Sequence, residues 1–407
     1  MKKTAVCNRR DFMQLVGSAS LCALIGHTEW LSATERTKSQ ATASFAYVGY
    51  SRKTYGHALA NRSEQGIQVF SIRGERWVPT QTIASDSPSF LTLHPSQRFL
   101  YAINEVDNYQ GLPSGAIEAY AIDPHHGHLT LLNRQPLSLS GIMPRHMAVS
   151  PDGSNVVVAV HGGGAYNVLP IGSEGHLGRV SGIAKEIGSG PNEKHQEASH
   201  PQMVMFDTSG RHLLGADLGS DRLSVFTLDD GKLAVRNRNA AQPGSGPRHM
   251  ALHPSGHLLF VANELDASVS CFRYDAMNGE ILERLHHVAS LPNDLYRKNV
   301  GTLTIHPSGR FLYTPNRSLA SDYLLANGIT VWDISTTGAL TPIQSWSEGL
   351  DFLHGMVIAP DGTSLSLLGQ KSGSVLRVGI DPASGQLSKP VRVAKLQAPI
   401  SLAVKYL

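Results

Sequence analysis

One pattern recurs six times along the chain and constrains the fold more strongly than any other feature. Each copy contains a short apolar segment, a turn that usually begins with proline, and a second run of apolar residues. The copies are LTLHPSQRFLYAINE (91–105), HMAVSPDGSNVVVAV (146–160), MVMFDTSGRHLLGAD (203–217), HMALHPSGHLLFVANE (249–264), LTIHPSGRFLYTPNR (303–317) and MVIAPDGTSLSLLGQ (356–370). Their turns lie 46 to 57 residues apart, so we interpret them as one supersecondary unit repeated with loop variation.

A third and a fourth strand are expected after each copy. Gly or Ser leads into a third apolar segment, and a Gly-rich turn then leads into a more polar one. Clear third segments are GAIEAYAID (115–123), DRLSVFTLD (221–229), ASVSCFRYD (267–275), GITVWDIS (328–335) and GSVLRVGID (373–381). Four short antiparallel strands at this spacing are typical of a β-propeller blade. Because a single such sheet would leave one face unburied, the blades have to pack around an axis.

The two ends of the chain supply the strands of a seventh blade. Pro399–Leu407 has the pattern of a first strand, whereas Ala43–Tyr50 and Gly66–Ile72 have the patterns of second and third strands. Joining them would close the ring and leave no open edge. The sequence therefore predicts an all-β fold, a seven-bladed β-propeller of four-stranded antiparallel blades. The N- and C-terminal strands close the ring, and one domain covers residues 43–407.

Residues 1–42 are expected to be a twin-arginine export signal and a linker. Lys2 and Lys3 begin a basic region, NRRDFM (8–13) contains the paired arginines, and an apolar run from Leu15 to Ile25 follows. That run is too short to span a bilayer stably. The prediction is a periplasmic or secreted protein that uses the twin-arginine (Tat) export machinery and has no stable membrane association. A basic amphipathic helix is the alternative interpretation.

Composition excludes several other classes of partner. The formal net charge is +3 with both signs interspersed, so nothing indicates a nucleic-acid partner. Of the three cysteines, only Cys271 lies outside the first 42 residues, and it is expected to be a small buried hydrophobe. No Cys pair, Gly-x-Ser-x-Gly or His-Glu-x-x-His motif occurs. We therefore expect no metal, no cofactor and a monomer.

The fourth copy of the unit carries the clearest candidate for chemistry. Arg248 precedes its first strand and Glu264 follows its second, and a hairpin turning at Pro254–Gly256 would bring both to the same edge of the sheet. Such a pair could bind a ligand. It could also be an ion pair that braces adjacent strands, as Arg145 and Glu105 could be in earlier copies. Two long insertions, 174–200 and 286–300, are expected near the same face.

Several motifs together resemble one family. SHPQMVMFD with ADLGSDRLSVF, GPRHMALHPSGHLLFVANE and TIHPSGRFLYTPNRS are similar to segments of the lactonase family of seven-bladed propellers. That family includes propeller-type 6-phosphogluconolactonases and fungal carboxy-muconate cyclases. The resemblance covers nearly all of residues 44–407. It implies that His200, Arg248, Glu264 and Arg317 line a central channel as catalytic residues.

Lactone opening assigns roles to these residues. A base has to activate water, and a cation or donor has to meet the carbonyl oxygen as it becomes negative. Arg248 and Arg317 suit the second task, while Glu264 and His200 are alternatives for the base. His249, Asn263 and Gln202 are predicted to bind substrate, with turn capping or a supporting role as the alternative for the first two. Gln202 stands where the family commonly has a second histidine, and an amide cannot titrate.

The resulting prediction is hydrolysis of a sugar lactone, with a small-molecule lactone as partner. Because a phosphorylated sugar lactone is a cytoplasmic metabolite, export favours an unphosphorylated aldonolactone. Two alternatives stay open: a muconate-type cycloisomerase, which needs the arginines but no activated water, and an exported propeller that binds a ligand or partner without catalysis.

Overall fold

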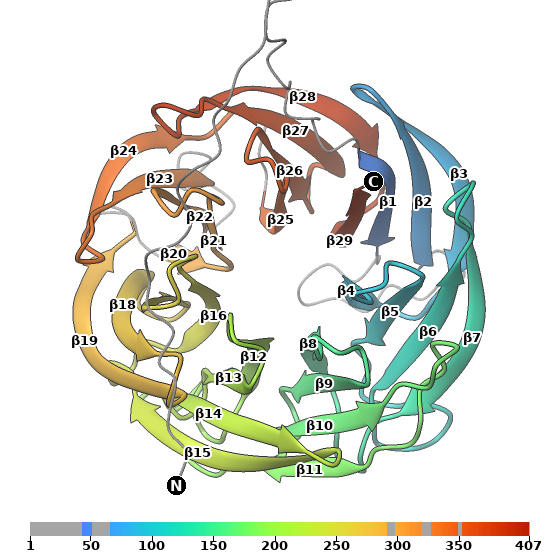
Figure 1. Cartoon of the computed structure of the whole chain (residues 1–407), viewed down its shortest axis with the longest axis horizontal. Helices are drawn as coiled ribbons and strands as arrows, with labels where there is room; N and C mark the ends of the chain where they lie inside the picture. Colours follow the sequence, from blue (N-terminus) through green and yellow to red (C-terminus); the bar gives the residue numbers. More distant parts are fainter. Residues whose placement is uncertain (1–42, 51–65, 291–297, 319–326, 349–351, 407) are drawn as a thin grey trace, which may run out of the picture. The chain divides into compact units, whose positions relative to one another are not determined.

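The chain folds into seven antiparallel sheets arranged around a central axis (Figure 1). The computed structural model describes residues 43–50, 66–290, 298–318, 327–348 and 352–406, all within the compact unit Gln40–Leu407. The export signal predicted for residues 1–42 lies outside the described residues. In the described part of the chain, no helix is long and apolar enough to cross a membrane.

Each sheet is one blade, named here by its innermost strand. The β4 blade contains β4 (Pro88–Leu93), β5 (Phe99–Asn104), β6 (Ala116–Ile122) and β7 (Leu129–Pro136). The β8 blade contains β8 (Pro144–Val149), β9 (Asn155–Val160), β10 (Ala165–Pro170) and β11 (Gly182–Lys185). The β12 blade contains β12 (Pro201–Phe206), β13 (His212–Asp217), β14 (Arg222–Asp229) and β15 (Lys232–Ala240). The β16 blade contains β16 (Pro247–Leu252), β17 (Leu258–Asn263), β18 (Ser268–Asp275) and β19 (Glu280–Ala289).

The next blade departs from the four-stranded pattern. Its inner edge is divided between β20 (Lys298–Val300) and β21 (Thr304–Ile305), which both pair with β22 (Phe311–Ser318). This β21 blade continues with β23 (Gly328–Ile334) and β24 (Leu340–Trp346). The β25 blade follows, with β25 (Leu353–Ile358), β26 (Ser364–Gly369), β27 (Ser374–Ile380) and β28 (Leu387–Lys395).

Strands from the two ends of the chain close the ring, as the sequence predicts. The closing β29 blade has the order β29 (Pro399–Tyr406), β1 (Ala43–Tyr50), β2 (Gly66–Arg73) and β3 (Arg76–Ala84). β29 pairs antiparallel with β1, with Tyr47 opposite Ala403. The hydroxyl of Ser401 then donates to the carbonyl of Pro88 in the β4 blade at 2.6 Å. The predicted seven-bladed fold and its closure are therefore confirmed.

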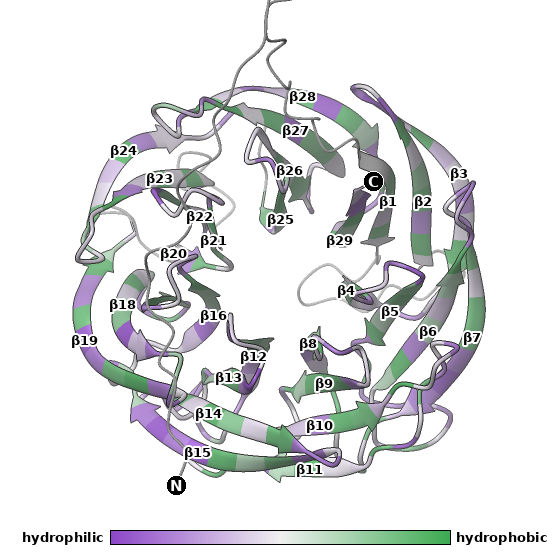
Figure 2. Ribbon diagram, viewed as in Figure 1, coloured by the Kyte–Doolittle hydropathy of each residue, from purple (hydrophilic) through white to green (hydrophobic). Residues whose placement is uncertain are grey.

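The hydrophobic core lies between the blades. Seven clusters of buried apolar side chains are found in the described residues, one at each interface between neighbouring blades. Second strands such as β5 are buried along their whole length, whereas outer strands such as β15 alternate between exposed and half-buried residues. Figure 2 shows this difference as hydrophilic segments on the outer strands. Cys271 is fully buried, as expected, and burial raises the pKa of its thiol to about 12.

The repeated HPS turn is explained by a contact between blades. In His253, Nδ1 accepts the backbone N–H of Ser255 at 3.1 Å, which places the ring proton on Nε2. Nε2 then donates to the carbonyl of Gly309 in the next blade at 2.9 Å. His94 and His306 make the same contacts, to Gly153 and Gly362. We call these three residues the bracing histidines, because each joins its blade to the next one.

Candidate active site

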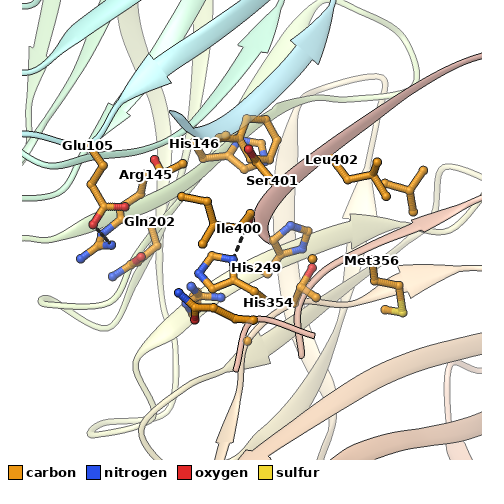
Figure 3. Close-up of a pocket in the computed structure, with 18 of the residues that line it drawn as sticks. Glu105, Arg145, His146, Gln202, His249, His354, Met356, Ile400, Ser401 and Leu402 are labelled. Atoms are coloured by element: carbon orange, nitrogen blue, oxygen red, sulfur yellow. Dashed lines mark hydrogen bonds and ion pairs between the residues drawn. The ribbon is translucent and has the colours of Figure 1, made fainter. Parts of the chain in front are cut away.

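A cavity of about 620 Å³ lies where the innermost strands of the seven blades meet (Figure 3). Every blade contributes at least one lining residue. The following residues represent the seven blades, one for each blade in chain order: Ser89, Arg145, Gln202, Arg248, Thr304, His354 and Ile400. A cavity at the centre of the ring that combines apolar walls with a few polar groups is the usual form of a ligand site.

A β-bulge aims these side chains into the cavity. In six blades the second residue of the innermost strand has no partner in the register with the second strand. These unpaired positions are Ser89, Arg145, Gln202, Arg248, His354 and Ile400. A bulge bends the strand and redirects one side chain. The β21 blade has no such bulge, and its residues 301–303 run unpaired between β20 and β21 instead.

Two arginine–glutamate pairs lie at this end of the ring. Arg248 Nε lies 2.5 Å from Glu264 Oε2, because the β16–β17 hairpin brings its two ends to one edge, as the sequence predicts. Arg145 Nη1 lies 2.5 Å from Glu105 Oε1, but these residues come from neighbouring blades. Arg145, Glu105 and Arg248 line the cavity, whereas Glu264 contacts Arg248 but is not among the lining residues. Both guanidinium groups are therefore held by a carboxylate at the cavity wall.

Glu264 is held as a carboxylate. Burial alone would raise its pKa, but the charges of Arg248 and Arg317 and a hydrogen bond from Asn299 outweigh burial, and the net pKa is lowered from 4.5. Because the Glu264 carboxylate already accepts hydrogen bonds from Arg248 and Asn299, it is not free to take a proton from water. The geometry therefore makes Glu264 a partner that orients Arg248.

Arg317 acts from behind the cavity wall. It is only 2% exposed, it donates through Nη2 to Asn299 Oδ1 at 3.4 Å, and its guanidinium lies 5.3 Å from the centre of the Phe352 ring. Gly301 lines the cavity directly in front of it, and a Cβ at that position would collide with the guanidinium. The Arg317 side chain therefore influences the cavity through its charge rather than through direct lining.

His200 and Gln202 lie side by side but face different surroundings. His200 does not line the cavity: its Nε2 faces Glu197 Oε1 at 2.9 Å and its Nδ1 faces the carbonyl of His161 at 3.2 Å. Its ring also stacks on that of His161, with ring centres 4.4 Å apart. Gln202 does line the cavity, and its amide donates to His161 Nδ1 at 3.1 Å. Both ring nitrogens of His200 are thus directed at oxygen acceptors.

Of the two other predicted binding residues, only one reaches the cavity. His249 lines it. Asn263 is fully buried, and its amide donates to the hydroxyls of Ser268 at 2.8 Å and Ser270 at 2.9 Å. Asn263 therefore braces the β17–β18 pair behind the site, which is the supporting role left open by the sequence.

Sequence reasoning missed two histidines that line the cavity, His146 and His354. Burial, with the charge of Arg248, lowers the pKa of His146 to about 3. Burial, followed by the charges of Arg317, Arg248 and Arg145, lowers the pKa of His354 to about 3. Both rings are therefore neutral near pH 7. They could have been found from their place in the repeat, because each follows the start of an innermost strand by one or two residues.

The site is electropositive. Arg145, Arg248 and Arg317 stand against the carboxylates Glu105 and Glu264, while the cavity histidines are neutral. Within the described residues, no group of three or more His, Cys, Asp or Glu side chains could hold a metal ion. Such a site suits a ligand that is negative or becomes negative during a reaction.

The comparisons with known proteins agree with this fold. The model of the family "Lactonase, 7-bladed beta-propeller" matches residues 45–404, so the chain belongs to the lactonase family of seven-bladed β-propellers. The 6-phosphogluconolactonase of Bacillus subtilis is 27% identical over 366 residues, which cover 89% of this chain and 98% of that protein. The 6-phosphogluconolactonase of Formosa agariphila is 27% identical and covers 80% of this chain and 91% of its own length.

A solved structure shows the same fold. The periplasmic gluconolactonase PpgL of Pseudomonas aeruginosa has a TM-score of 0.76 with 24% sequence identity, over 89% of this chain and 99% of that one. The family match and the curated relatives show that the enzyme class of the chain is that of a lactonase, a hydrolase of carboxylic esters.

Proposed function

We propose that the protein hydrolyses a sugar lactone, an unphosphorylated aldonolactone, in its central cavity. The observation that carries this proposal is Arg248: a bulge directs it into the cavity, and Glu264 fixes its guanidinium. Hydrolysis of a lactone creates negative charge on the carbonyl oxygen and then a carboxylate product. A fixed guanidinium at the cavity wall stabilises both species.

The charge of the site supports a substrate without a phosphate group. Arg145, Arg248 and Arg317 stand against the carboxylates Glu105 and Glu264, so the net positive charge of this set suits a single developing negative charge. A phosphate would bring up to two further negative charges. The two curated relatives are named for the phosphorylated lactone, so this chain would share their chemistry and differ in the substituent that it accepts.

The assay is hydrolysis by the purified protein of a panel of aldonolactones with and without a 6-phosphate. We expect turnover of an unphosphorylated lactone, and a loss of ~10²–10³ in kcat for Arg248→Ala. Arg236→Ala is the matched control, because Arg236 is exposed on outer strand β15. Wild-type turnover in the Arg248→Ala variant would contradict the proposed site. Lactone formation from a dicarboxylic diene would point to cycloisomerisation, and saturable binding without turnover would point to a binding protein.

We also propose that residues 1–42 direct the protein to the periplasm or beyond through the twin-arginine pathway. The support is the sequence NRRDFM followed by the apolar run to Ile25. Cell fractionation of the full chain tests this: the wild type should leave the cytoplasm, and replacement of Arg9 and Arg10 by Lys should retain it there. Equal cytoplasmic retention of both forms would contradict export.

A further inference from the structure

The reaction needs a group that accepts a proton from water, and most basic groups around the cavity are already occupied. Glu264 and Glu105 are bound by arginines. Both nitrogens of His200 face oxygen acceptors, and Gln202 occupies Nδ1 of His161. A base must present a free lone pair to the substrate. These four groups do not.

His146 and His249 are also unsuited to accept the proton. Within the described residues, Nδ1 of each ring is enclosed by protein atoms and has no hydrogen-bond partner, so water in the cavity does not reach it. The ring of His146 also bonds to the backbone of Val204. For His249, the tautomer that avoids an unpaired buried N–H carries its proton on Nε2, which makes that nitrogen a donor.

His354 has the geometry that the others lack. Its Nδ1 lies 2.7 Å from the backbone carbonyl of Ile400 (Figure 3). Because a carbonyl oxygen only accepts, Nδ1 carries the ring proton and Nε2 has a lone pair. No described residue makes a hydrogen bond to Nε2, and the side chain lines the cavity from its bulge in β25. The contact with Ile400 comes from the closing blade, so ring closure fixes the tautomer of this imidazole.

The charges around His354 favour proton transfer to Nε2 as negative charge develops on the substrate. His354 is surrounded by Arg317 from β22, Arg248 from β16 and Arg145 from β8. Glu264 and Glu105 offset two of these charges, and the neighbouring His146 and His249 are neutral. Burial, together with this net positive field, keeps the free imidazole unprotonated. When negative charge develops on the substrate, it cancels part of this field, so the proton affinity of Nε2 rises as the reaction needs it.

We propose that His354 is the general base of the lactone hydrolysis. This inference rests on the proposed function. Nε2 takes a proton from water while the water oxygen bonds to the lactone carbonyl carbon, and the resulting oxyanion lies against Arg248. The ring C–O bond then breaks, and the imidazolium returns its proton to the departing alkoxide. Lactone and water become a hydroxy acid, which ionises to the carboxylate.

The test is His354→Asn in the full chain. An asparagine amide can still donate to the Ile400 carbonyl, but it has no basic nitrogen. We expect kcat to fall by ~10²–10⁴-fold with KM within a few-fold of wild type. Free imidazole added to the assay should restore part of the lost rate, which a merely structural role would not allow. His176→Asn is the matched control, because His176 is exposed in the turn between β10 and β11.

Two comparisons keep the inference falsifiable. If the wild type is inactive on the whole lactone panel, the proposed function fails. If the wild type is active and His354→Asn keeps its kcat, only His354 is excluded. A larger loss of kcat in His200→Asn than in His354→Asn would assign the base to His200.

The pH profile of the wild type is a second readout that needs no variant. Because the pKa of His354 is about 3, kcat/KM should stay level from about pH 8 to about pH 5. A fall centred near the ordinary histidine value of about 6.5 would overturn the assignment.

Discussion

The two ends of the ring use histidine in opposite ways. At the turn end, the bracing histidines His94, His253 and His306 have partners on both ring nitrogens and join adjacent blades. At the cavity end, His354 lines the cavity, and among the described residues only the carbonyl on Nδ1 is a hydrogen-bond partner of its ring. The same repeat thus joins neighbouring blades at one end and, in our proposal, supplies the base at the other. A histidine is a candidate for chemistry when its contacts leave one nitrogen available.

The largest expected effect concerns the two arginines at the cavity end. Burial is the main cause of the lowered pKa of four neutral histidines, and the charge of Arg248 adds to it in each of them: His146, His161, His249 and His354. Arg145 acts on only two of them, His161 and His354. We therefore expect Arg248→Ala to lower kcat by ~10²–10³-fold and Arg145→Ala to lower it less. Steady-state kinetics on the preferred lactone checks the order, and a greater loss in Arg145→Ala would reverse the ranking.

At the turn end, we expect loss of stability without loss of catalysis. Gly309 has a φ of +78°, and a Cβ there would lie 2.4 Å from Nε2 of His253. Gly74, in the turn between β2 and β3, has a φ of +61° and no atom within 4 Å of a Cβ. We therefore expect Gly309→Ala to lower the free energy of unfolding by ~1–3 kcal/mol more than Gly74→Ala does. Urea unfolding measures the difference, and equal midpoints for the two variants would contradict the bracing role.

The smallest effect is a pH dependence of stability at the cavity end. Although burial raises the pKa of Glu264, Arg248, Arg317 and Asn299 lower it below 4.5 overall. The carboxylate therefore makes its full contribution to stability when the pH is above the ordinary value of 4.5. This contribution is lost as the pH falls through the lowered pKa of the folded state. The stability difference between wild type and Glu264→Gln should shrink from about pH 6 to about pH 3. A difference that grows on acidification would mean that Glu264 is protonated in the fold.

The fold could be predicted because the repeat contains nearly all the information it needs. Spacing, turns and the unmatched strands at both ends determine seven blades and their closure. Arg248 and Glu264 could be brought together because they flank one hairpin. The segment 174–200 was harder: part of it forms β11, the outermost strand of its blade, and only the remainder returns toward His200.

The rest of the site depends on contacts between distant parts of the chain. Arg145 meets Glu105 across two blades, and His354 is oriented by Ile400 of the closing strand. The bulges that direct these side chains inward leave no mark in an apolar–polar pattern. His200 was predicted as a channel residue, but the segment before β12 turns its ring onto His161. Periodicity predicts which residues are buried, and only the closed ring shows which ones converge.

The most direct test of the account is a crystal structure with the aldonate product bound. We expect the carboxylate in the central cavity, hydrogen-bonded to the guanidinium of Arg248, with one oxygen within hydrogen-bond distance of His354 Nε2. A product that occupies another surface, or a carboxylate in the cavity that contacts neither Arg248 nor His354, would contradict it.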